Sequence, residues 1–337
     1  KKLQKEKAFA NKELVLKKDL SAEEIARFNV RSFNFQNAFI AKRYRRISDY
    51  PNIFSHVLGY TSKTEDAYKS VPEIPRSHWR DAELVYAHGL IKGRTGLEEI
   101  YEDHLRGSYG ERVYEINAMG KLVQSLSITK PLKGSDLHTN LDIEAQKSAA
   151  KFLGNRRGAV VAIDLDSGGI NVLYSSPTYS INQLSNGMNE DDFQILIDDP
   201  DKPFFNRALK GRYPPASTIK PAIGMYGVSK NIVNWDFEIK DPGFFTLPET
   251  GRVFRGWRKG GHGKVNMHKA FLVSSNTYFF SLAYQADIEE LSSHLTSLGF
   301  GQKVCLDCFD EDQALVPTPE WKYSNMNAGW VKGDTVN

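Results

Sequence analysis

A serine and a lysine three residues apart, Ser217 and Lys220, are the strongest candidates for chemistry in this 337-residue sequence. Two prolines, Pro214 and Pro215, precede them, and proline suits the residues just before a helix better than a helix interior. The spacing therefore predicts a helix that begins at Ser217. It also predicts that Lys220 lies one turn along the same face, with its amine within reach of the serine hydroxyl.

Such a pair is suited to nucleophilic catalysis. A serine hydroxyl attacks well only when a neighbouring base takes its proton. A lysine amine can be that base only when it is neutral, so its reference pKa of about 10.4 must fall by roughly 3, which costs about 4 kcal/mol. Burial and nearby positive charge can lower the pKa that far. We predict that Ser217 is a nucleophile and that Lys220 is its base.

The Ser-x-x-Lys pattern is weak evidence by itself, because it recurs along the chain. It occurs at Ser127/Lys130, Ser148/Lys151 and Ser217/Lys220. The first pair lies in a linker before a proline, and the second lies in the middle of an amphipathic helix. Only the third follows a Pro-Pro turn.

A second motif, Ser274-Ser275-Asn276, begins 57 residues after Ser217. A Ser-x-Asn loop can place a hydroxyl and an amide beside the lysine. Ser274 would then relay protons, and Asn276 would hold the serine–lysine pair and the substrate backbone. The alternative is an ordinary helix cap, for which serine and asparagine are also preferred. The order of the two motifs favours the catalytic interpretation.

The elements that position these motifs predict two domains, as the length also suggests. Residues 1–150 read as an amino-terminal α/β module whose first helix is capped by Ser21 with Glu24 three residues later. Residues 61–90 are polar and contain two prolines, so we predict a mobile insertion there. A strand pair follows, over 112–117 and 121–123.

The composition changes near residue 140, where the second domain begins to take shape. A helix is predicted over 142–153, a buried strand over 158–163 and a returning strand over 170–174. Helices dominate from there to about residue 300. The predicted fold class is α+β and multidomain, with the second domain over 151–337.

The bulk composition restricts the function classes. Hydrophobic residues make up 40% and charged residues 25%, as in soluble globular proteins, and a net charge of +3 does not suggest a nucleic-acid partner. The lysine-rich first twenty residues favour a solvated helix face, with contact to an anionic membrane as the alternative. No apolar run reaches the roughly 18 residues of a membrane span. Because the chain does not begin with Met, we take it as a fragment, and the lack of an anchor is uninformative.

The two cysteines, Cys305 and Cys308, form a single Cys-x-x-Cys pair. A structural zinc site needs about four ligands, and no second pair exists. A disulfide, a thiol pair and a redox motif all stay open. Redox catalysis is the least favoured, because no βαβ pattern lies nearby.

Ser-x-x-Lys followed by Ser-x-Asn resembles the penicillin-binding proteins and serine β-lactamases. Further stretches are similar to class B penicillin-binding proteins, in particular the penicillin-binding protein 2 group of the rod-elongation machinery, from about residue 20 to the last residue. These stretches are His56-Val57-Leu58-Gly59-Tyr60, Gly93-Arg94-Thr95-Gly96-Leu97-Glu98, Tyr114-Glu115-Ile116-Asn117-Ala118, Asn140-Leu141-Asp142, Gly158-Ala159-Val160-Val161-Ala162-Ile163-Asp164, Asn206-Arg207-Ala208, Asp241-Pro242-Gly243, Gly261-His262-Gly263 and Pro317-Thr318-Pro319-Glu320-Trp321.

The resemblance implies a pedestal for dimerisation and partner binding, followed by a transpeptidase domain of β-lactamase-like fold with a sheet flanked by helices. It implies D,D-transpeptidation, in which Ser217 attacks the D-Ala-D-Ala bond of a peptidoglycan stem peptide and releases D-alanine. The acyl group then passes to an amine on a neighbouring stem, and β-lactams would acylate the same serine. Lys220 is the implied base, and Ser274 and Asn276 form the second motif. No cofactor is implied.

The resemblance also implies a biological setting, lateral cell-wall elongation. The expected partners are a SEDS-type glycosyltransferase and a rod-shape scaffold protein. The expected location is the cell inner membrane, with one amino-terminal anchor outside this chain and the catalytic domain in the periplasm.

The sequence departs from the family at several positions. No Lys-Thr-Gly strand follows Asn276, so we expect a domain truncated before that motif and a fragment of impaired activity; Arg94-Thr95-Gly96 is similar but precedes the nucleophile. Ala216 replaces the usual glycine before the nucleophile, which tightens the turn. Some relatives hold zinc through Asp, Asp, His and Cys. The matching positions are Asp241, Gly256, His262 and Ser275, so we predict no metal and an ordinary hydrogen-bonded loop histidine at 262.

Three other functions compete with transpeptidation. A D,D-carboxypeptidase or a β-lactamase would use the same acyl-serine chemistry, but a β-lactamase needs a deacylating base and would lack the large amino-terminal module. A binding module is the rival from a different class. In that case the pedestal recruits elongation partners and the serine domain is inert.

Overall fold

The computed structural model divides the chain into two compact units, 1–204 and 205–337, and each is described by itself. The structure describes residues 16–35, 38–40, 45–63, 91–108, 110–116, 122–308 and 310–336. Most of the lysine-rich start and most of the predicted insertion, residues 64–90, lie outside the described residues. Among the residues that are described, no helix has the length and apolar character needed to span a membrane.

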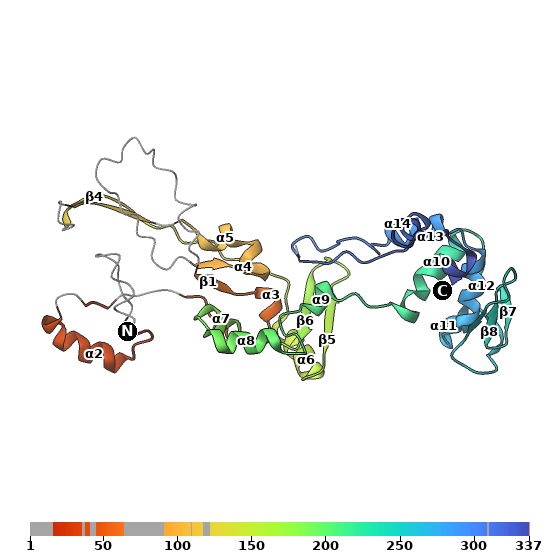
Figure 1. The fold of residues 1–337 in the computed structure, drawn as a ribbon, viewed down its shortest axis with the longest axis horizontal. Coiled ribbons are helices and arrows are strands. Elements are labelled where there is room, and N and C mark those ends of the chain that lie inside the picture. The colour runs from red at the N-terminus through yellow and green to blue at the C-terminus, as the bar shows by residue number, and fades with distance from the viewer. Residues whose placement is uncertain are drawn as a thin grey trace. The chain divides into compact units, whose positions relative to one another are not determined.

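The first unit mixes short helices with antiparallel strand pairs, as predicted (Figure 1). Helix α2 (Ala22–Arg31) starts at the expected capping box, in which the Ser21 hydroxyl accepts from the Glu24 amide at 3.2 Å and the Glu24 carboxylate accepts from the Ser21 amide at 3.0 Å. The following elements are η1 (Ser32–Asn34), α3 (Ser55–Leu58), β1 (Thr61–Lys63), β2 (Ile91–Gly93), α4 (Gly96–Ile100), α5 (Glu102–Arg106), β3 (Glu111–Ile116) and β4 (Leu122–Thr129). Strands β1 and β2 pair antiparallel, as do β3 and β4.

Two glycines let the chain around α3 approach the start of α4 closely. Gly59 has a φ of +74°, and a side chain there would lie 1.8 Å from the Thr95 carbonyl oxygen. Gly96 has a φ of +61°, and a side chain there would lie 2.5 Å from the Val57 carbonyl oxygen. Only glycine fits both the left-handed backbone and the close contact. The Arg94-Thr95-Gly96 stretch is therefore a backbone packing motif within the first unit.

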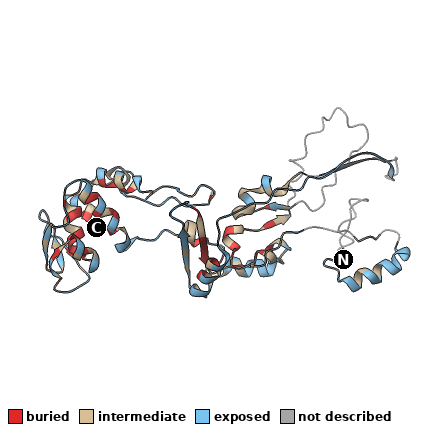
Figure 2. Ribbon diagram, turned by 180° about the vertical axis from the view of Figure 1, so that it is seen from behind, coloured by how far each residue is buried: buried red, intermediate tan, exposed pale blue. Residues whose placement is uncertain are grey.

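A helix and a hairpin complete the first unit. Helix α6 (Ile143–Leu153) packs on β6 (Ile170–Ser176), which pairs antiparallel with β5 (Gly158–Ile163); α7 (Ile181–Ser185) and α8 (Glu190–Asp198) follow. The fully buried Gln146 side chain accepts from the Leu173 amide at 3.0 Å and donates to its carbonyl at 2.9 Å. The prediction that 158–163 is a buried strand was wrong. Because α6 packs mainly on β6, that strand is the buried one, and β5 is mostly exposed (Figure 2).

The second unit is mainly helical, with two small hairpins. Its elements are α9 (Arg207–Lys210), η4 (Ala216–Ile219), α10 (Lys220–Ser229), β7 (Glu238–Asp241), β8 (Phe244–Thr246), β9 (Val253–Arg255), β10 (Gly263–Asn266), α11 (Met267–Leu272), α12 (Asn276–Gln285), α13 (Ile288–Ser297), α14 (Pro319–Met326) and α15 (Lys332–Val336). Strand β7 pairs with β10, and β8 pairs with β9. Within the described residues each sheet has two strands.

Helices α10 and α12 lie at the centre of the second unit. The core around α12 holds Tyr278, Phe279 and Leu282, together with Val265 and Met267. A second core joins Ala222 and Tyr226 of α10 to α13. Burying these apolar side chains contributes roughly 1.5–3 kcal/mol each, so α10 and α12 are held firmly against each other. These two helices carry the two sequence motifs at their amino-terminal ends.

Candidate active site

Ser217 lies in the short 3-10 helix η4, which runs directly into α10 at Lys220. The Pro214-Pro215 turn precedes η4, as the sequence predicts. In a 3-10 helix residues i and i+3 lie on the same side, so the Ser217 and Lys220 side chains share a face. Ser217 is exposed and Lys220 is buried, which suits a nucleophile open to substrate and a base shielded from water.

The backbone before the nucleophile is strained. Ala216 has a φ of +49°, in the left-handed region that favours glycine. This agrees with the tight turn expected from the replacement of the usual glycine. Ser274 has a φ of +51°, so a second residue of the site also takes this unfavourable backbone conformation.

The Ser-x-Asn motif lies in the turn between α11 and α12. The Ser275 hydroxyl caps α12 by accepting from the Tyr278 amide at 3.3 Å. The helix-cap interpretation is therefore right for the middle residue. The outer residues, Ser274 and Asn276, direct their side chains to Lys220.

A chain of hydrogen bonds joins the four predicted site residues. The Lys220 Nζ donates to Asn276 Oδ1 at 2.7 Å, to the Ser274 carbonyl oxygen at 2.9 Å and to Ser274 Oγ at 3.0 Å. Ser274 Oγ lies 3.0 Å from Ser217 Oγ. The sequence predicts direct contact between the lysine amine and the Ser217 hydroxyl, whereas the structure places the Ser274 hydroxyl between them.

Burial lowers the pKa of Lys220 below its ordinary value. Three oxygen acceptors around Nζ favour the charged ammonium and oppose this effect, but burial prevails. The direction is the one that a lysine base requires. The Phe279 ring, 5.4 Å from Nζ, forms part of the apolar surroundings.

Comparison with known proteins identifies the family. Residues 158–337, more than half of the chain, match the family model described as the penicillin-binding protein transpeptidase domain. The chain belongs to this family. Residues 1–139 match the penicillin-binding protein dimerisation domain.

The relatives that this member of the family matches are longer than it is. It is 38% identical over 324 residues to the peptidoglycan D,D-transpeptidase MrdA of Acinetobacter baumannii, covering 96% of the chain and 47% of that protein. It is 33% identical to the protein of that name from Escherichia coli K12, covering 95% of the chain and 50% of that protein. The chain therefore spans about half the length of the curated relatives it matches.

Two solved penicillin-binding protein structures have the same fold. Pseudomonas aeruginosa PBP2 in complex with WCK 5153 gives a TM-score of 0.74 at 32% identity, covering 87% of the chain and 59% of that structure. Helicobacter pylori PBP2 in complex with MreC gives a TM-score of 0.80 at 29% identity, covering 94% of the chain and 56% of that structure.

The other Ser-x-x-Lys pairs have ordinary structural settings. Ser127 is an exposed residue of β4, and Ser148 in α6 donates its hydroxyl to the Glu144 carbonyl at 2.8 Å. The prediction of a helix around Ser148 is confirmed, whereas the prediction of a linker at Ser127 was wrong, because β4 extends to Thr129.

The four positions at which family members are expected to hold zinc do not fit that metal here. Asp241 and His262 are buried and bonded to each other through Oδ2 and Nδ1 at 2.8 Å. Gly256 offers no ligand atom, and the Ser275 hydroxyl donates to Asp241 Oδ2 at 2.8 Å. The predicted loop histidine is hydrogen-bonded, as expected, and its side chain is almost completely buried.

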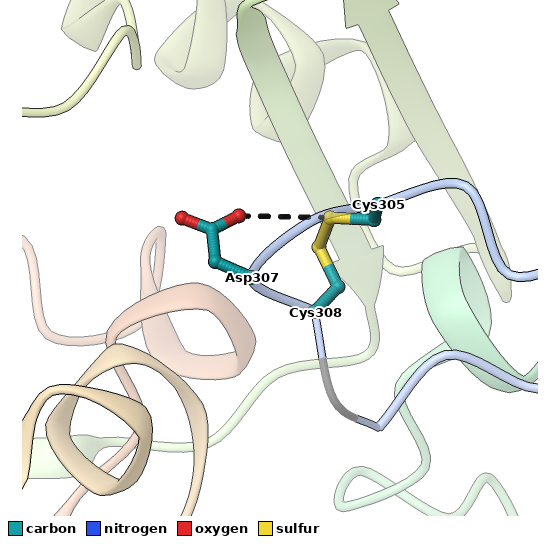
Figure 3. Close-up of side chains that lie close together, drawn as sticks. All are labelled: Cys305, Asp307 and Cys308. Atoms are coloured by element: carbon teal, nitrogen blue, oxygen red, sulfur yellow. Dashed lines mark hydrogen bonds between the residues drawn. A yellow bond between two sulfur atoms is a disulfide. The ribbon is translucent and has the colours of Figure 1, made fainter.

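Cys305 and Cys308 form a disulfide (Figure 3). The Asp307 carboxylate lies beside the Cys305 sulfur, and these three residues are the only group with metal-ligand spacing found in the described part of the chain. Because both sulfurs are in the disulfide, no thiolate is available to a metal. Of the three alternatives that the sequence leaves open, the structure shows the disulfide.

Sequence reasoning missed one residue beside the site. The exposed Trp257 indole donates to the Val273 carbonyl at 3.1 Å, next to Ser274. A lone tryptophan within the glycine-rich stretch 256–263 is the signal that could have drawn attention to it.

Proposed function

We propose that this chain is part of a peptidoglycan D,D-transpeptidase that cross-links stem peptides through an acyl-enzyme on Ser217. The observation that carries the proposal is the continuous contact from Ser217 Oγ through Ser274 Oγ to Lys220 Nζ, closed by Asn276. Family membership supports the acyl-serine chemistry, and the relatives named D,D-transpeptidase support the substrate class.

The geometry suggests how the proton moves. With a neutral Lys220, the hydroxyl hydrogens can rotate so that Ser217 donates to Ser274 and Ser274 donates to the amine. As Ser217 Oγ attacks the carbonyl carbon of the penultimate D-alanine, its proton passes through Ser274 to Lys220. The same path returns that proton to the leaving nitrogen when the C–N bond breaks and D-alanine departs.

The second half of the reaction uses the same groups. The amine of a neighbouring stem peptide attacks the ester carbonyl of the acyl-enzyme and loses a proton through the Ser274–Lys220 path. The Ser217–carbonyl bond then breaks, and Ser217 Oγ recovers a proton by the reverse route. Asn276, bonded to Nζ at 2.7 Å, keeps the amine in place through both steps.

The larger assignment extends this proposal to the whole protein. We infer a pedestal over 1–150 and a transpeptidase domain over 151–337, because the two family matches end at 139 and begin at 158. We also infer periplasmic action from an inner-membrane anchor, with a SEDS-type glycosyltransferase and a rod-shape scaffold protein as partners. The Helicobacter pylori PBP2 structure contains MreC, which supports a scaffold partner.

Intact mass spectrometry after incubation with a β-lactam tests the proposal, on protein expressed from its whole gene. The expected result is one covalent adduct on the parent and none on the Ser217→Ala variant. Ser297→Ala, which removes an exposed hydroxyl in α13, is the matched control and should form the adduct as the parent does. Equal adducts on the parent and on Ser217→Ala would place the nucleophile elsewhere.

A further inference from the structure

Three buried polar side chains are hydrogen-bonded to one another at the Ser-x-Asn loop, one of them from its middle residue, and the catalytic proposal does not use them. Asp241 ends β7, His262 comes just before β10, and Ser275 caps α12. Their side chains are almost completely buried, with Asp241 at 2% and His262 at 5% exposure. Burying polar groups costs free energy unless they are paired, and these three are paired with one another, although His262 Nε2 is buried without a hydrogen-bond partner among the described residues.

Asp241 is the centre of this group. Its Oδ2 accepts from Ser275 Oγ and from His262 Nδ1, both at 2.8 Å, and its Oδ1 accepts from the Gly243 amide at 2.7 Å. Three donors thus converge on this carboxylate, and hydrogen bonds to a carboxylate favour its ionised form. Hydrogen bonds to an ionised group are short and strong, which makes this group rigid.

The group holds the residue at the centre of the catalytic loop. Ser275 lies between Ser274 and Asn276, and both of these bond Lys220 Nζ. Ser274 has a φ of +51°, which a non-glycine residue keeps only when its surroundings impose it. The Ser275 hydroxyl is fixed on one side by Asp241 and on the other by the Tyr278 amide, so it imposes that backbone.

The same contacts occupy one oxygen of Asp241 completely. A carboxylate oxygen has two lone pairs, and Oδ2 uses both to accept from Ser275 and His262. Position 256 is a glycine and offers no ligand atom. The Cβ of any other residue there would lie 3.6 Å from the Thr277 hydroxyl oxygen. Two of the four positions that the family resemblance assigns to a zinc site thus offer no ligand of the expected kind, because one is Gly256 and the other is the Ser275 hydroxyl, which donates to Asp241.

We propose that Ser275, Asp241 and His262 form a metal-free clamp that positions Ser274 and Asn276 around Lys220. The three are positioning residues, because none touches the nucleophile. The inference rests on the proposed acyl-serine function and adds how the loop that serves it is held.

The test separates binding from acylation. A fluorescent penicillin is mixed with protein expressed from its whole gene, and the dissociation constant and the acylation rate constant are measured separately. Ser275→Ala removes the link to Asp241, and Asp241→Asn weakens the clamp while leaving the cap of α12 intact. We expect each variant to acylate about 10- to 100-fold more slowly, with the dissociation constant little changed, because a small misplacement of reacting groups slows chemistry that much.

Two controls distinguish positioning from simple loss of stability. Ser275→Thr keeps a hydroxyl and should restore at least half of the acylation rate, whereas Ser297→Ala should leave it unchanged. Rates are compared for the folded fraction, measured by circular dichroism. Folded Ser275→Ala that acylates as fast as the parent, or Ser275→Thr as slow as Ser275→Ala, would overturn the clamp.

Metal content provides a readout independent of activity. Elemental analysis of the purified parent should find far less than one zinc per chain, and a chelator should leave its acylation rate unchanged. One tightly held zinc per chain would overturn the metal-free clamp. A parent that acquires no adduct on Ser217 would overturn the proposed function and the clamp with it, whereas an acylated parent beside unimpaired variants would overturn the clamp alone.

Discussion

At the scale of single residues, the candidate site depends on where one hydroxyl lies. Two side chains three positions apart were expected to touch, and the structure connects them through Ser274 Oγ, 3.0 Å from each partner atom. The four residue types and their order were predictable from the sequence. The route was not, because it depends on the left-handed backbone of Ser274, and no local pattern specifies that conformation for a serine.

The lowered pKa of Lys220 predicts the pH dependence of acylation. Only the neutral amine accepts the proton of Ser217, and the neutral fraction rises with pH through the lowered pKa. The acylation rate by a β-lactam should therefore increase with pH and level off before the ordinary lysine pKa of about 10.4. A stopped-flow series over pH measures this, and a rate that falls across the same range would contradict it.

The free energy of unfolding should also increase with pH. Between the lowered pKa of Lys220 and its ordinary value, the unfolded chain holds the lysine proton and the folded chain has released it. The unfolded state binds more protons there, so the free energy of unfolding contributed by this group rises with pH across that window. A Lys220→Met variant should lack this increase in denaturant titrations at stepped pH.

The strained turn at Ala216 predicts a stabilising substitution. Its φ of +49° costs an alanine roughly 1–2 kcal/mol, and glycine takes that backbone without the steric conflict. After allowing for the greater freedom of glycine in the unfolded chain, Ala216→Gly should stabilise the protein by about 1 kcal/mol. Thermal unfolding followed by circular dichroism measures this, and a lower melting temperature would contradict it.

At the scale of elements, the sequence predicted where strands and helices occur better than it predicted which of them are buried. The capped helix α2, the helix α6 and the hairpin β5–β6 lie where their patterns place them. Yet β5, with an apolar run, is mostly exposed, and β6 is buried. An apolar run indicates a strand, but which strand is covered depends on where α6 packs, and that is a tertiary choice.

The close packing of α3 against α4 predicts a position-specific effect of glycine. Gly59→Ala introduces a side chain 1.8 Å from the Thr95 carbonyl oxygen and also strains a φ of +74°. Gly168→Ala is the matched control, because its φ is +72° but nothing lies within 4 Å. Gly59→Ala should destabilise the protein by at least about 2 kcal/mol more than Gly168→Ala, because only in Gly59→Ala must a neighbouring backbone segment move to make room for the new methyl group. Equal effects in denaturant titrations would mean that backbone strain alone matters.

At the scale of the whole molecule, two compact units must each supply their own core. The second unit buries apolar side chains from α10, α12 and α13 in adjoining clusters, and the Ser-x-x-Lys and Ser-x-Asn motifs lie at the start of two of these helices. The site is thus held by helix packing rather than by the loops alone. Residues of a turn placed at the ends of packed helices move little, and precise positioning of reacting groups requires this.

The disulfide bears on the redox state of the compartment in which the protein acts. Disulfides persist in oxidising compartments such as the periplasm and are rare in the cytosol. If the protein acts in the periplasm, Cys305 and Cys308 should be fully oxidised in cells. Protein is trapped from cells with an alkylating reagent under denaturing conditions and digested. The peptide that contains Cys305 and Cys308 should carry no label before reduction and two labels after it, as peptide mass would show.

A Cys305→Ser/Cys308→Ser variant controls for reaction at other side chains, and the same peptide from it should carry no label in either state. The disulfide closes only four residues, so its loss should cost at most about 2 kcal/mol by loop-closure entropy, and the variant should still fold. Two labels without reduction would place the cysteines in a reducing compartment. That outcome would contradict the periplasmic location while leaving the acyl-serine chemistry of Ser217 to be judged by its own adduct.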